Sequence, residues 1–146
     1  MCSLIIKPPI TEKEFQDYYQ LRWQLLAKPW KQDFKISQDD KEKVSNHLTA
    51  HYKNQLVGVG RLHFNTKSEA QIRYMGVITE YHGNNIGRAI EKGLRKIALK
   101  NNANSIILNA RENTIPFYER LGYKQIEQAH ILFDVIKHTK MKILLR

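Results

Sequence analysis

With 146 residues, 42% of them hydrophobic and 26% charged, the chain has the size and composition of one folded domain, expected to span residues 1–146. No apolar run is long enough to cross a bilayer and the N-terminus is charged too early for a signal peptide, so we expect a cytoplasmic protein. The net charge of +10 favours an anionic partner, without choosing among nucleic acid, an anionic surface and a polyphosphate cofactor.

The first part of the chain predicts one strand and two helices. Residues 3–9 have the pattern of a short strand that ends at two prolines. Thr11 and Glu14 have the spacing of a capping box, and the apolar residues after them recur at helical spacing, which predicts a helix over residues 11–28. The charged segment 37–44 (SQDDKEKV) is expected to form a second, short polar helix.

The middle of the chain predicts three strands and a helix. Side chains alternate over residues 46–65, which predicts a hairpin with its turn near Asn54, and they alternate again over residues 69–79. Residues 86–98 then place their apolar side chains on one helical face, with Glu91 among the charged residues elsewhere on the helix.

The last part predicts a buried strand over residues 105–110, a short helix closed by Gly122 at its C-cap, and strands over residues 123–133 and 139–145. The order is therefore β-α-α-β-β-β-α-β-α-β-β. Antiparallel meanders flank one strand–helix–strand crossover, which should be right-handed and place two strands parallel. The sequence predicts a mixed α/β sheet covered by helices.

The loop over residues 82–88 contains more small and polar residues than a turn needs. Either it is an extended helix cap, or its backbone N–H groups point at an anion. It lies at the carboxyl end of a strand, where open α/β sheets bind ligands. A dinucleotide fingerprint is excluded because only Gly83 and Gly87 are present, and a P-loop because the Gly-Lys-Ser/Thr ending is missing.

The same segment, His82-Gly83-Asn84-Asn85-Ile86-Gly87, resembles the acetyl-CoA pyrophosphate loop of the GNAT acetyltransferase superfamily, whose pattern Arg/Gln-x-x-Gly-x-Gly/Ala opens a helix. The preceding IRYMGV matches the family's cofactor strand, and the later NARENTIPFYERLGYKQI matches its Asn…Phe-Tyr-x-x-Leu-Gly-Tyr/Phe element. The resemblance covers nearly the whole chain and is strongest over residues 56–128. It implies a GNAT-like fold with a splayed cofactor cleft, acetyl-CoA as cofactor, and a small stand-alone bacterial subgroup.

The resemblance also implies which residues contact the cofactor. The pyrophosphate should bind the loop backbone, where His82 and Asn85 depart from the family's Arg/Gln and Gly; Asn tolerates the left-handed conformation that the loop needs. The pantetheine arm should pair with the backbone of strand residues 75–77, with a bulge at Gly76. The expected cofactor-binding residues are Met75, Gly76, Val77, His82, Gly83, Asn84, Asn85, Ile86, Gly87, Arg88, Asn109, Asn113 and Phe117.

Some of these residues have a structural interpretation as well. Arg88 lies either near the phosphates or on the solvated face of its helix. Asn113 either contacts the arm or caps the following helix, and the two roles are compatible. Phe117 either packs beside the arm or belongs to the core.

Catalysis is expected to involve Tyr118, which matches the family tyrosine whose hydroxyl approaches the thioester sulfur and can protonate the leaving thiolate. A buried tyrosine with a structural hydrogen bond is the alternative. The general base is open, because Gln71 occupies the position where relatives often hold a glutamate. The candidates are His63, Glu112 and His138, with a chain of water molecules as the alternative.

The acceptor site is expected between the first two helices and the last hairpin, which build its walls in the superfamily. Its expected residues are Arg22, Trp23, Trp30, His63, Arg73 and Arg111. Several arginines there would favour a carboxylated or phosphorylated acceptor, whereas core packing is the alternative for the tryptophans.

The sequence therefore predicts an N-acetyltransferase that transfers an acetyl group from acetyl-CoA directly to the amine of a small molecule or peptide in a ternary complex. One alternative is a CoA-binding regulator without catalysis, suggested by His82, Asn85 and Gln71. The other is an RNA- or ribosome-associated module, suggested by the charge, but the basic helix has no aromatic residue to stack on bases, so nucleic acid is not expected. The one cysteine, Cys2, excludes a disulfide framework and a thiolate metal site, so no metal is expected; a homodimer is left open.

Overall fold

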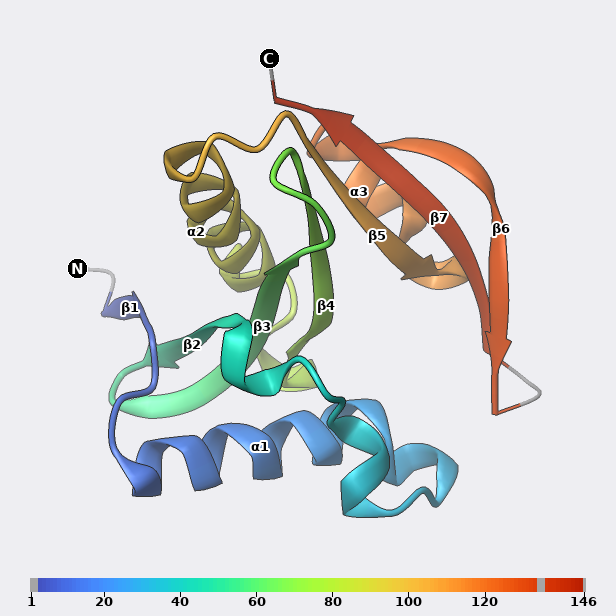
Figure 1. The fold of residues 1–146 in the computed structure, drawn as a ribbon. Coiled ribbons are helices and arrows are strands. Elements are labelled where there is room, and N and C mark those ends of the chain that lie inside the picture. The colour runs from blue at the N-terminus through green and yellow to red at the C-terminus, as the bar shows by residue number, and fades with distance from the viewer. Residues whose placement is uncertain (1–2, 134–135, 146) are drawn as a thin grey trace.

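The computed structural model describes residues 3–133 and 136–145, which form a mixed sheet with helices on both faces (Figure 1). The strand order is β1 (Leu4–Lys7), β2 (Asn46–Tyr52), β3 (Gln55–Phe64), β4 (Glu69–Val77), β5 (Ser105–Arg111), β7 (Ile136–Leu144) and β6 (Lys124–Leu132). Within this described sheet, β4 and β5 are the one parallel pair. The predicted mixed α/β fold with a single parallel crossover is confirmed.

Three α-helices are described: α1 (Glu12–Leu26), α2 (Ile86–Lys100) and α3 (Ile115–Arg120). Helix α2 covers β2, β3 and β4 on one face of the sheet, and α1 covers β3 and β4 on the other. Glycines let both helices approach closely. An added Cβ at Gly60 would lie 2.6 Å from Ile90 on α2, and one at Gly76 would lie 3.2 Å from Leu25 on α1. None of the described helices is long and apolar enough to cross a membrane.

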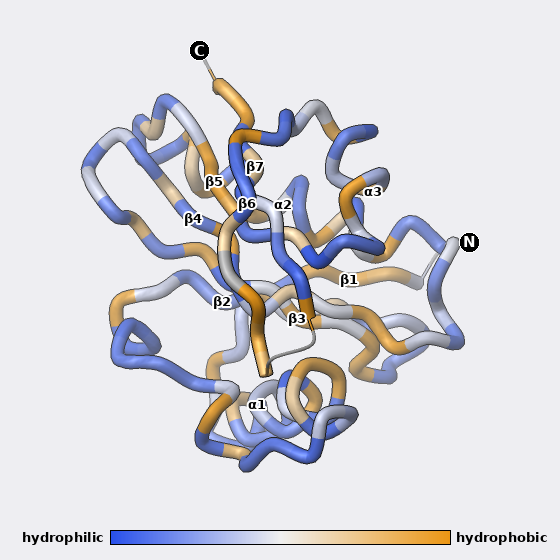
Figure 2. The backbone as a smooth tube through the Cα atoms, turned by 90° about the vertical axis from the view of Figure 1, so that its right-hand side faces the viewer, coloured by the Kyte–Doolittle hydropathy of each residue, from blue (hydrophilic) through white to orange (hydrophobic). Residues whose placement is uncertain are grey.

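The main core lies between α2 and the sheet, where Leu62, Ile90, Leu94 and Ile106 are fully buried. A smaller core around Tyr18, Leu21 and Val59 lies under α1. Hydrophobic residues follow much of the strands, and many connecting loops are hydrophilic (Figure 2). Helices α1 and α2 both contact β4, so this strand is held by helices from either side.

Local sequence signals account for several boundaries. The capping box of α1 is confirmed, because Thr11 Oγ1 accepts from Glu14 N at 3.1 Å while Glu14 Oε1 accepts from Thr11 N at 2.9 Å. The predicted hairpin is also confirmed, and its turn residues Lys53 and Asn54 have φ values of 51° and 67°. Strand β7 begins at Ile136, earlier than the predicted start at residue 139.

The prediction for Glu91 needs correction. This residue was placed on the charged part of α2, but it is only 2% exposed. Its carboxylate accepts from the Tyr123 hydroxyl at 2.7 Å and from Arg95 Nε at 3.0 Å. The helix therefore contacts the segment after α3 as well as the sheet, which buries a second part of its surface.

The predicted polar helix over residues 37–44 is wrong. The segment begins at the last residue of the 3-10 turn Phe34–Ser37 and ends with the 3-10 turn Glu42–Val44. Its acidic side chains Asp39 and Glu42 turn towards the sheet and bind arginines there. These contacts replace the solvated helical face that the charge pattern suggested.

Candidate functional site

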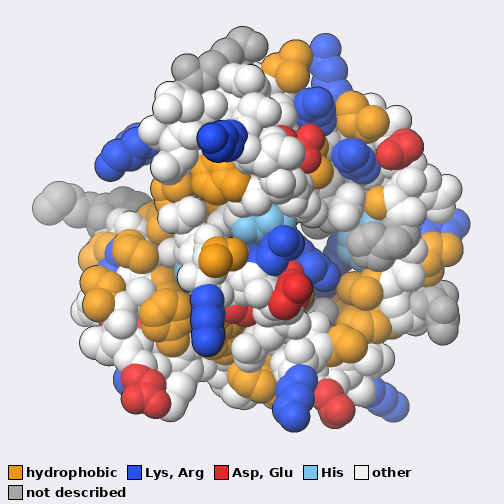
Figure 3. Space-filling view, viewed as in Figure 1, with side chains coloured by type: hydrophobic (Ala, Val, Ile, Leu, Met, Phe, Trp, Pro, Cys, Tyr) orange, Lys and Arg blue, Asp and Glu red, His pale blue; other side chains and the backbone are white. Residues whose placement is uncertain are grey.

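A gap opens in the sheet between β4 and β5. The two strands pair only where Glu69–Gln71 lies beside Ser105–Ile107, and beyond those residues they separate. We call this gap, from Gln71 on β4 and Ile107 on β5 to the strand ends, the cleft. In the space-filling view a hollow lies in this region, and basic, acidic and histidine side chains gather around it (Figure 3). The predicted splay of the two strands is confirmed.

A β-bulge on β4 accompanies the cleft. The pairing of β3 with β4 shifts between Val59 and Arg61, and Tyr74 opposite this shift has a φ of 56°. Gly76, where we expected the bulge, stays paired with Val59. The bulge therefore lies at Tyr74 and Met75, just before the segment expected to bind the pantetheine arm.

The loop before α2 presents backbone donors. Asn85 is the N-cap of α2 in the left-handed conformation, with a φ of 62°, and Gly83 has a φ of 89°. Within the described part of the chain, no acceptor binds the backbone N–H groups of Gly83, Asn85, Ile86, Gly87 and Arg88. Those of the first helical turn point out along the helix axis, where an anion is stabilised. This geometry suits a pyrophosphate.

The side chains of the loop contribute less than its backbone. His82 Nε2 lies 2.9 Å from the carbonyl oxygen of Val77, so the imidazole donates to the end of β4. Asn84 and Asn85 are exposed, and the Asn85 side chain makes no capping hydrogen bond. Arg88 is exposed on the first turn of α2, near the free N–H groups. Its predicted role at the phosphates stays a prediction.

The residues after β5 bring aromatic rings to the cleft. Phe117 packs at the start of α2, where a Cβ added to Gly87 would lie 3.3 Å from its ring. Asn109 on β5 and Asn113 in the 3-10 turn Glu112–Thr114 are both exposed. Asn113 is not the cap of α3, because Thr114 occupies that position. A contact with the cofactor stays the prediction for both asparagines.

Tyr118 reaches across from α3 to β4. Its hydroxyl lies 3.6 Å from Met75 Sδ, and the residue is 8% exposed. Burial raises the pKa of this phenol well above its usual range, the charge of Glu91 raises it further, and Arg111 opposes the shift. The phenol is therefore protonated at neutral pH. Its described partner is a thioether, which is a weak acceptor, so the structural alternative of a strong buried hydrogen bond is not what the structure contains.

The candidate bases differ in their surroundings. His63 is buried on β3, with Nδ1 at 2.9 Å from the Arg61 guanidinium and Nε2 at 3.1 Å from Asn65 Oδ1. Because the guanidinium can only donate, Nδ1 accepts and no lone pair of His63 is left for a substrate. Burial lowers the pKa of His63, and the charge of Arg61 lowers it further. Its predicted place as an acceptor contact or base is therefore not supported.

Two candidate bases remain on the β5 side of the cleft. His138 is buried on β7, and its Nδ1 lies 3.1 Å from the carbonyl oxygen of Ile136. It pairs in register with Arg111 of β5, so the two side chains share one face of the sheet. Glu112 is exposed in the turn after β5.

Five charged side chains form what we call the ion cluster: Arg22, Asp39, Glu42, Arg61 and Arg73. Arg61 is fully buried, and its NH1 lies 2.6 Å from Asp39 Oδ1 and 2.9 Å from Glu42 Oε2. Arg22, also fully buried, donates to Glu42 at 2.9 Å, and the half-exposed Arg73 donates to Asp39 at 2.8 Å. Buried charges are stable only when paired in this way.

The ion cluster also holds the bulge of β4. The guanidinium carbons of Arg22, Arg61 and Arg73 lie 4.4, 4.9 and 4.6 Å from the ring centroid of Tyr74. Three cations against one aromatic ring favour the conformation that this residue adopts. The cluster thus supports the strand expected to bind the cofactor.

This arrangement corrects two predicted acceptor contacts. Arg22 is fully buried and donates to Glu42, to the Ser37 carbonyl and to the Tyr18 hydroxyl, so an acceptor cannot reach it. Trp23 is half-buried and donates through Nε1 to the Gln32 carbonyl at 2.8 Å, which gives it a packing role beneath the loop after α1.

Arg73 and Arg111 keep an accessible surface. The Arg73 side chain is 49% exposed although Asp39 holds one of its nitrogens. Arg111 ends β5, and its guanidinium carbon lies 4.7 Å from the Trp30 ring centroid. Trp30 in turn lies 6.4 Å from the Phe133 ring, between centroids. Arg111, Trp30 and Phe133 thus bring together the end of β5, the segment after α1 and the turn after β6.

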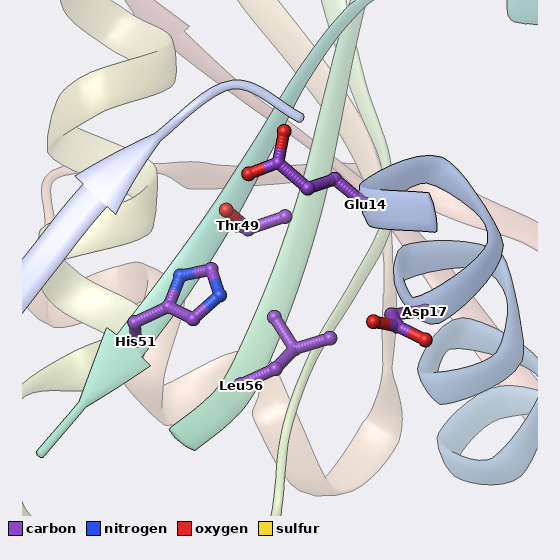
Figure 4. A pocket seen from close by; sticks show the side chains of 5 residues that line it. All are labelled: Glu14, Asp17, Thr49, His51 and Leu56. Atoms are coloured by element: carbon purple, nitrogen blue, oxygen red, sulfur yellow. The ribbon is translucent and has the colours of Figure 1, made fainter. Parts of the chain in front are cut away.

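A separate small cavity lies between the start of α1 and the hairpin of β2 and β3. It is lined by Glu14, Asp17, Thr49, His51 and Leu56 (Figure 4). Its volume of about 40 Å³ is close to that of one water molecule. It is too small for either substrate. Within residues 3–133 and 136–145, no group of three or more His, Cys, Asp or Glu side chains is arranged to hold a metal ion.

The sequence reasoning missed Asp39, Glu42 and Arg61. A signal for them was present, because Arg61 occupies an inward position of an alternating strand, and a buried arginine requires carboxylates. The nearby acidic segment could supply them. Its pattern was instead assigned to a solvated helix.

Comparison with known proteins agrees with the fold. A family model described as the acetyltransferase (GNAT) domain matches residues 12–145. The uncharacterized N-acetyltransferase YjcF of Bacillus subtilis is 25% identical over 130 residues, covering 89% of this chain and 92% of that protein. A Lactobacillus plantarum protein assigned as an N-acetyltransferase superimposes with a TM-score of 0.84 at 14% identity, covering 98% and 99% of the two chains. An aminoglycoside 6′-N-acetyltransferase complexed with coenzyme A superimposes with a TM-score of 0.79 at 14% identity, covering 97% of each chain.

The family model and the named relatives show an acyltransferase, and the cleft beside the free N–H groups and the buried tyrosine are compatible with this class. The chain belongs to the GNAT acetyltransferase family.

Proposed function

We propose that the protein transfers the acetyl group of acetyl-CoA directly to the amine of an acceptor, with both substrates bound together in the cleft. The observation that carries this proposal is the buried hydroxyl of Tyr118, which reaches β4 and has only the sulfur of Met75 as its described partner. A hydroxyl with so weak an acceptor can donate its proton to a substrate without losing a strong hydrogen bond. The structural neighbour complexed with coenzyme A supports the choice of cofactor.

The chain supplies complementary groups for both ends of the cofactor. The free N–H groups at the start of α2 suit the pyrophosphate, and the separated backbone of Met75–Val77 suits the amides of the pantetheine arm. The thioester would then lie near Tyr118. Attack by the amine would form a tetrahedral intermediate, and as its C–S bond breaks the thiolate would take the phenolic proton. The proton that the nitrogen then loses to become an amide would return through water to the phenolate.

The amine must lose a proton before it attacks. His63 has no free lone pair for this task, and Gln71, which accepts from Asn65 Nδ2 at 2.9 Å, cannot act as a base. We propose that the proton leaves through water in the cleft. Glu112 and His138 remain the side chains at its β5 side to which such water can pass it.

The test is Tyr118→Phe, which removes the hydroxyl and keeps the ring that packs against Phe117 and Tyr123. We expect kcat and kcat/KM to fall together by roughly 10²-fold, because the proton transfer matters only in the transition state. CoA affinity from calorimetry should change little. The loss should shrink with an acyl donor whose thiol is more acidic, since such a thiolate leaves without a proton.

An unchanged kcat in a folded Tyr118→Phe variant would contradict the catalytic role. A parent protein that binds CoA but releases no thiol with any amine of a broad panel would instead support the CoA-binding regulator. Failure to bind CoA at all would overturn both interpretations of the cleft.

A further inference from the structure

We propose that Arg111 binds a carboxylate of the acceptor, so that the acceptor is a small amine carrying a carboxylate a few bonds away, as in an amino acid. This inference rests on the proposed acetyl transfer and specifies the substrate class for the same cleft. It follows from the surroundings of Arg111 compared with those of the other arginines.

Arg111 lies at the entrance to the reaction centre. It is the last residue of β5, and its charge is close enough to Tyr118 to influence that phenol. The guanidinium carbon lies over the Trp30 ring, 4.7 Å from its centroid, and NH2 makes one long hydrogen bond of 3.5 Å to the Leu26 carbonyl. The guanidinium is therefore held in one place by an aromatic ring and the end of α1.

Arg111 differs from Arg22, Arg61, Arg73 and Arg95 in having no carboxylate partner among the described residues. Arg22, Arg61 and Arg73 are paired within the ion cluster, and Arg95 is paired with Glu91. Among the described residues no acidic side chain lies within ion-pair distance of Arg111. Burial lowers the pKa of this guanidinium, which means that the cleft destabilises its charge. An anionic group of a bound ligand would stabilise the charge of the guanidinium.

The free edge of Arg111 suits a carboxylate. A guanidinium has five N–H donors in one plane, and the hydrogen bonds of Arg111 to the described residues use one of them. The donors that make no hydrogen bond to described residues are left for a planar, bidentate acceptor such as a carboxylate. A single unpaired cation matches the single charge of a carboxylate better than the double charge of a phosphate. The nearness of Tyr118 limits the distance between amine and carboxylate to a few bonds.

The experiment compares matched acceptors: α-amino acids and their primary amides, with phosphoethanolamine against ethanolamine as the phosphate arm. Transfer from acetyl-CoA is followed by free thiol release. We expect kcat/KM for the amino acids to exceed that for their amides by roughly 10- to 100-fold, the usual worth of a charge-assisted hydrogen bond. This preference would oppose intrinsic reactivity, because the amide has the less basic and more readily deprotonated amine.

Arg111→Gln should remove this preference, so that the ratio of kcat/KM for the amino acids to kcat/KM for their amides falls to about one. This ratio is the measured quantity because losing the charge of Arg111 near Tyr118 affects both acceptors alike. Arg111→Lys keeps the charge but lacks the two parallel N–H donors of the guanidinium, so it should lose an intermediate part of the kcat/KM for amino acids. Arg120→Gln is the matched control, because Arg120 is an exposed arginine on α3 and its loss changes the net charge equally. CoA affinity should be the same in all three variants.

The proposal is overturned if the parent acetylates amino acids no better than their amides, or if Arg111→Gln retains the preference. It is equally overturned if phosphoethanolamine is the favoured arm, or if a parent that binds CoA acetylates no small amine of the panel. Failure of CoA binding would be separate, because it would remove the proposed function itself.

Discussion

The loop before α2 and the ion cluster under α1 are two polar regions built in opposite ways. The loop is exposed and consecutive in sequence, and its backbone N–H groups are the functional atoms. The ion cluster is buried, and its side chains come from α1, β3, β4 and the segment between α1 and β2. The first can bind a ligand without rearranging the protein. In the ion cluster the charges pair with one another, and the cluster supports β4 beside the cleft.

The difference in construction implies a difference in sensitivity. Substituting a loop residue should change ligand affinity and leave the fold largely intact. Substituting a buried member of the ion cluster should destabilise the fold, because the remaining charges lose their partners inside the protein. The following predictions separate the two regions by these criteria.

The largest effect is expected for Arg61→Met. Arg61 is fully buried and bridges Asp39 and Glu42, whose side chains are 17% and 12% exposed. Removing its charge leaves Glu42 with Arg22 and Asp39 with Arg73, and takes away the one cation that joins the two carboxylates in a poorly solvated place. We expect the free energy of unfolding from urea titration to fall by about 3–5 kcal/mol.

Arg73→Met is the matched control for this prediction. Arg73 binds the same Asp39, but its side chain is 49% exposed, so water compensates for most of the lost contact. We expect a loss of no more than about 1 kcal/mol. Equal losses for the two variants would contradict the view that burial determines how much each arginine of the ion cluster contributes to stability.

The contrast between the regions also explains what the sequence could reveal. Residues 82–88 were identified because a phosphate-binding backbone leaves a local pattern of small residues before a helix. The cleft and Tyr118 followed from motifs of the same local kind. The ion cluster left no such pattern, since Asp39 and Arg61 meet only after the sheet and the 3-10 turns have formed. The bulge was placed at Gly76 by the conformational freedom of glycine, whereas cation–π contacts place it at Tyr74.

The ion cluster should also make stability depend on acid. Burial alone would raise the pKa of the Asp39 carboxyl, but hydrogen bonds from Arg61 and the Lys41 N–H, with the charges of Arg61 and Arg73, hold it far below its usual range. A depressed pKa in the folded state gives stability that is present above the unfolded pKa of about 3.9 and is lost as pH falls below it.

Below pH 4 this carboxyl should lower the free energy of unfolding by at most about 1.4 kcal/mol for each pH unit. Unfolding free energies measured between pH 7 and 2.5 should show it in the parent. In Asp39→Asn, which cannot titrate, this part of the slope should be missing. A parent and variant with parallel profiles would contradict the assignment.

In the loop, Gly83→Val should weaken CoA binding by more than tenfold. Gly83 has a φ of 89°, which a β-branched residue adopts only under strain, and no protein atom lies within 4 Å of an added Cβ. The new side chain would therefore occupy the space before α2 that a phosphate needs. Calorimetric titration with CoA measures the effect, while urea unfolding should change by only about 1 kcal/mol. Parent-like affinity in the variant would show that the cofactor does not approach this loop.

The smallest effect is expected for Asn85→Gly, which restores the residue most common in the family loop. Asn85 is in the left-handed conformation, and its side chain makes no capping bond in the described structure. Glycine relieves the residual strain of that conformation but has more freedom to lose in the unfolded chain, and these contributions oppose each other. We therefore expect CoA affinity to stay within about twofold and stability to change by a few tenths of a kcal/mol. Asn85→Ala is the matched control, because alanine lacks both the tolerance of asparagine and the freedom of glycine, and it should cost about 1 kcal/mol. A large loss of CoA affinity in Asn85→Gly alone would mean that the asparagine side chain contacts a ligand, and the loop would then not act through its backbone.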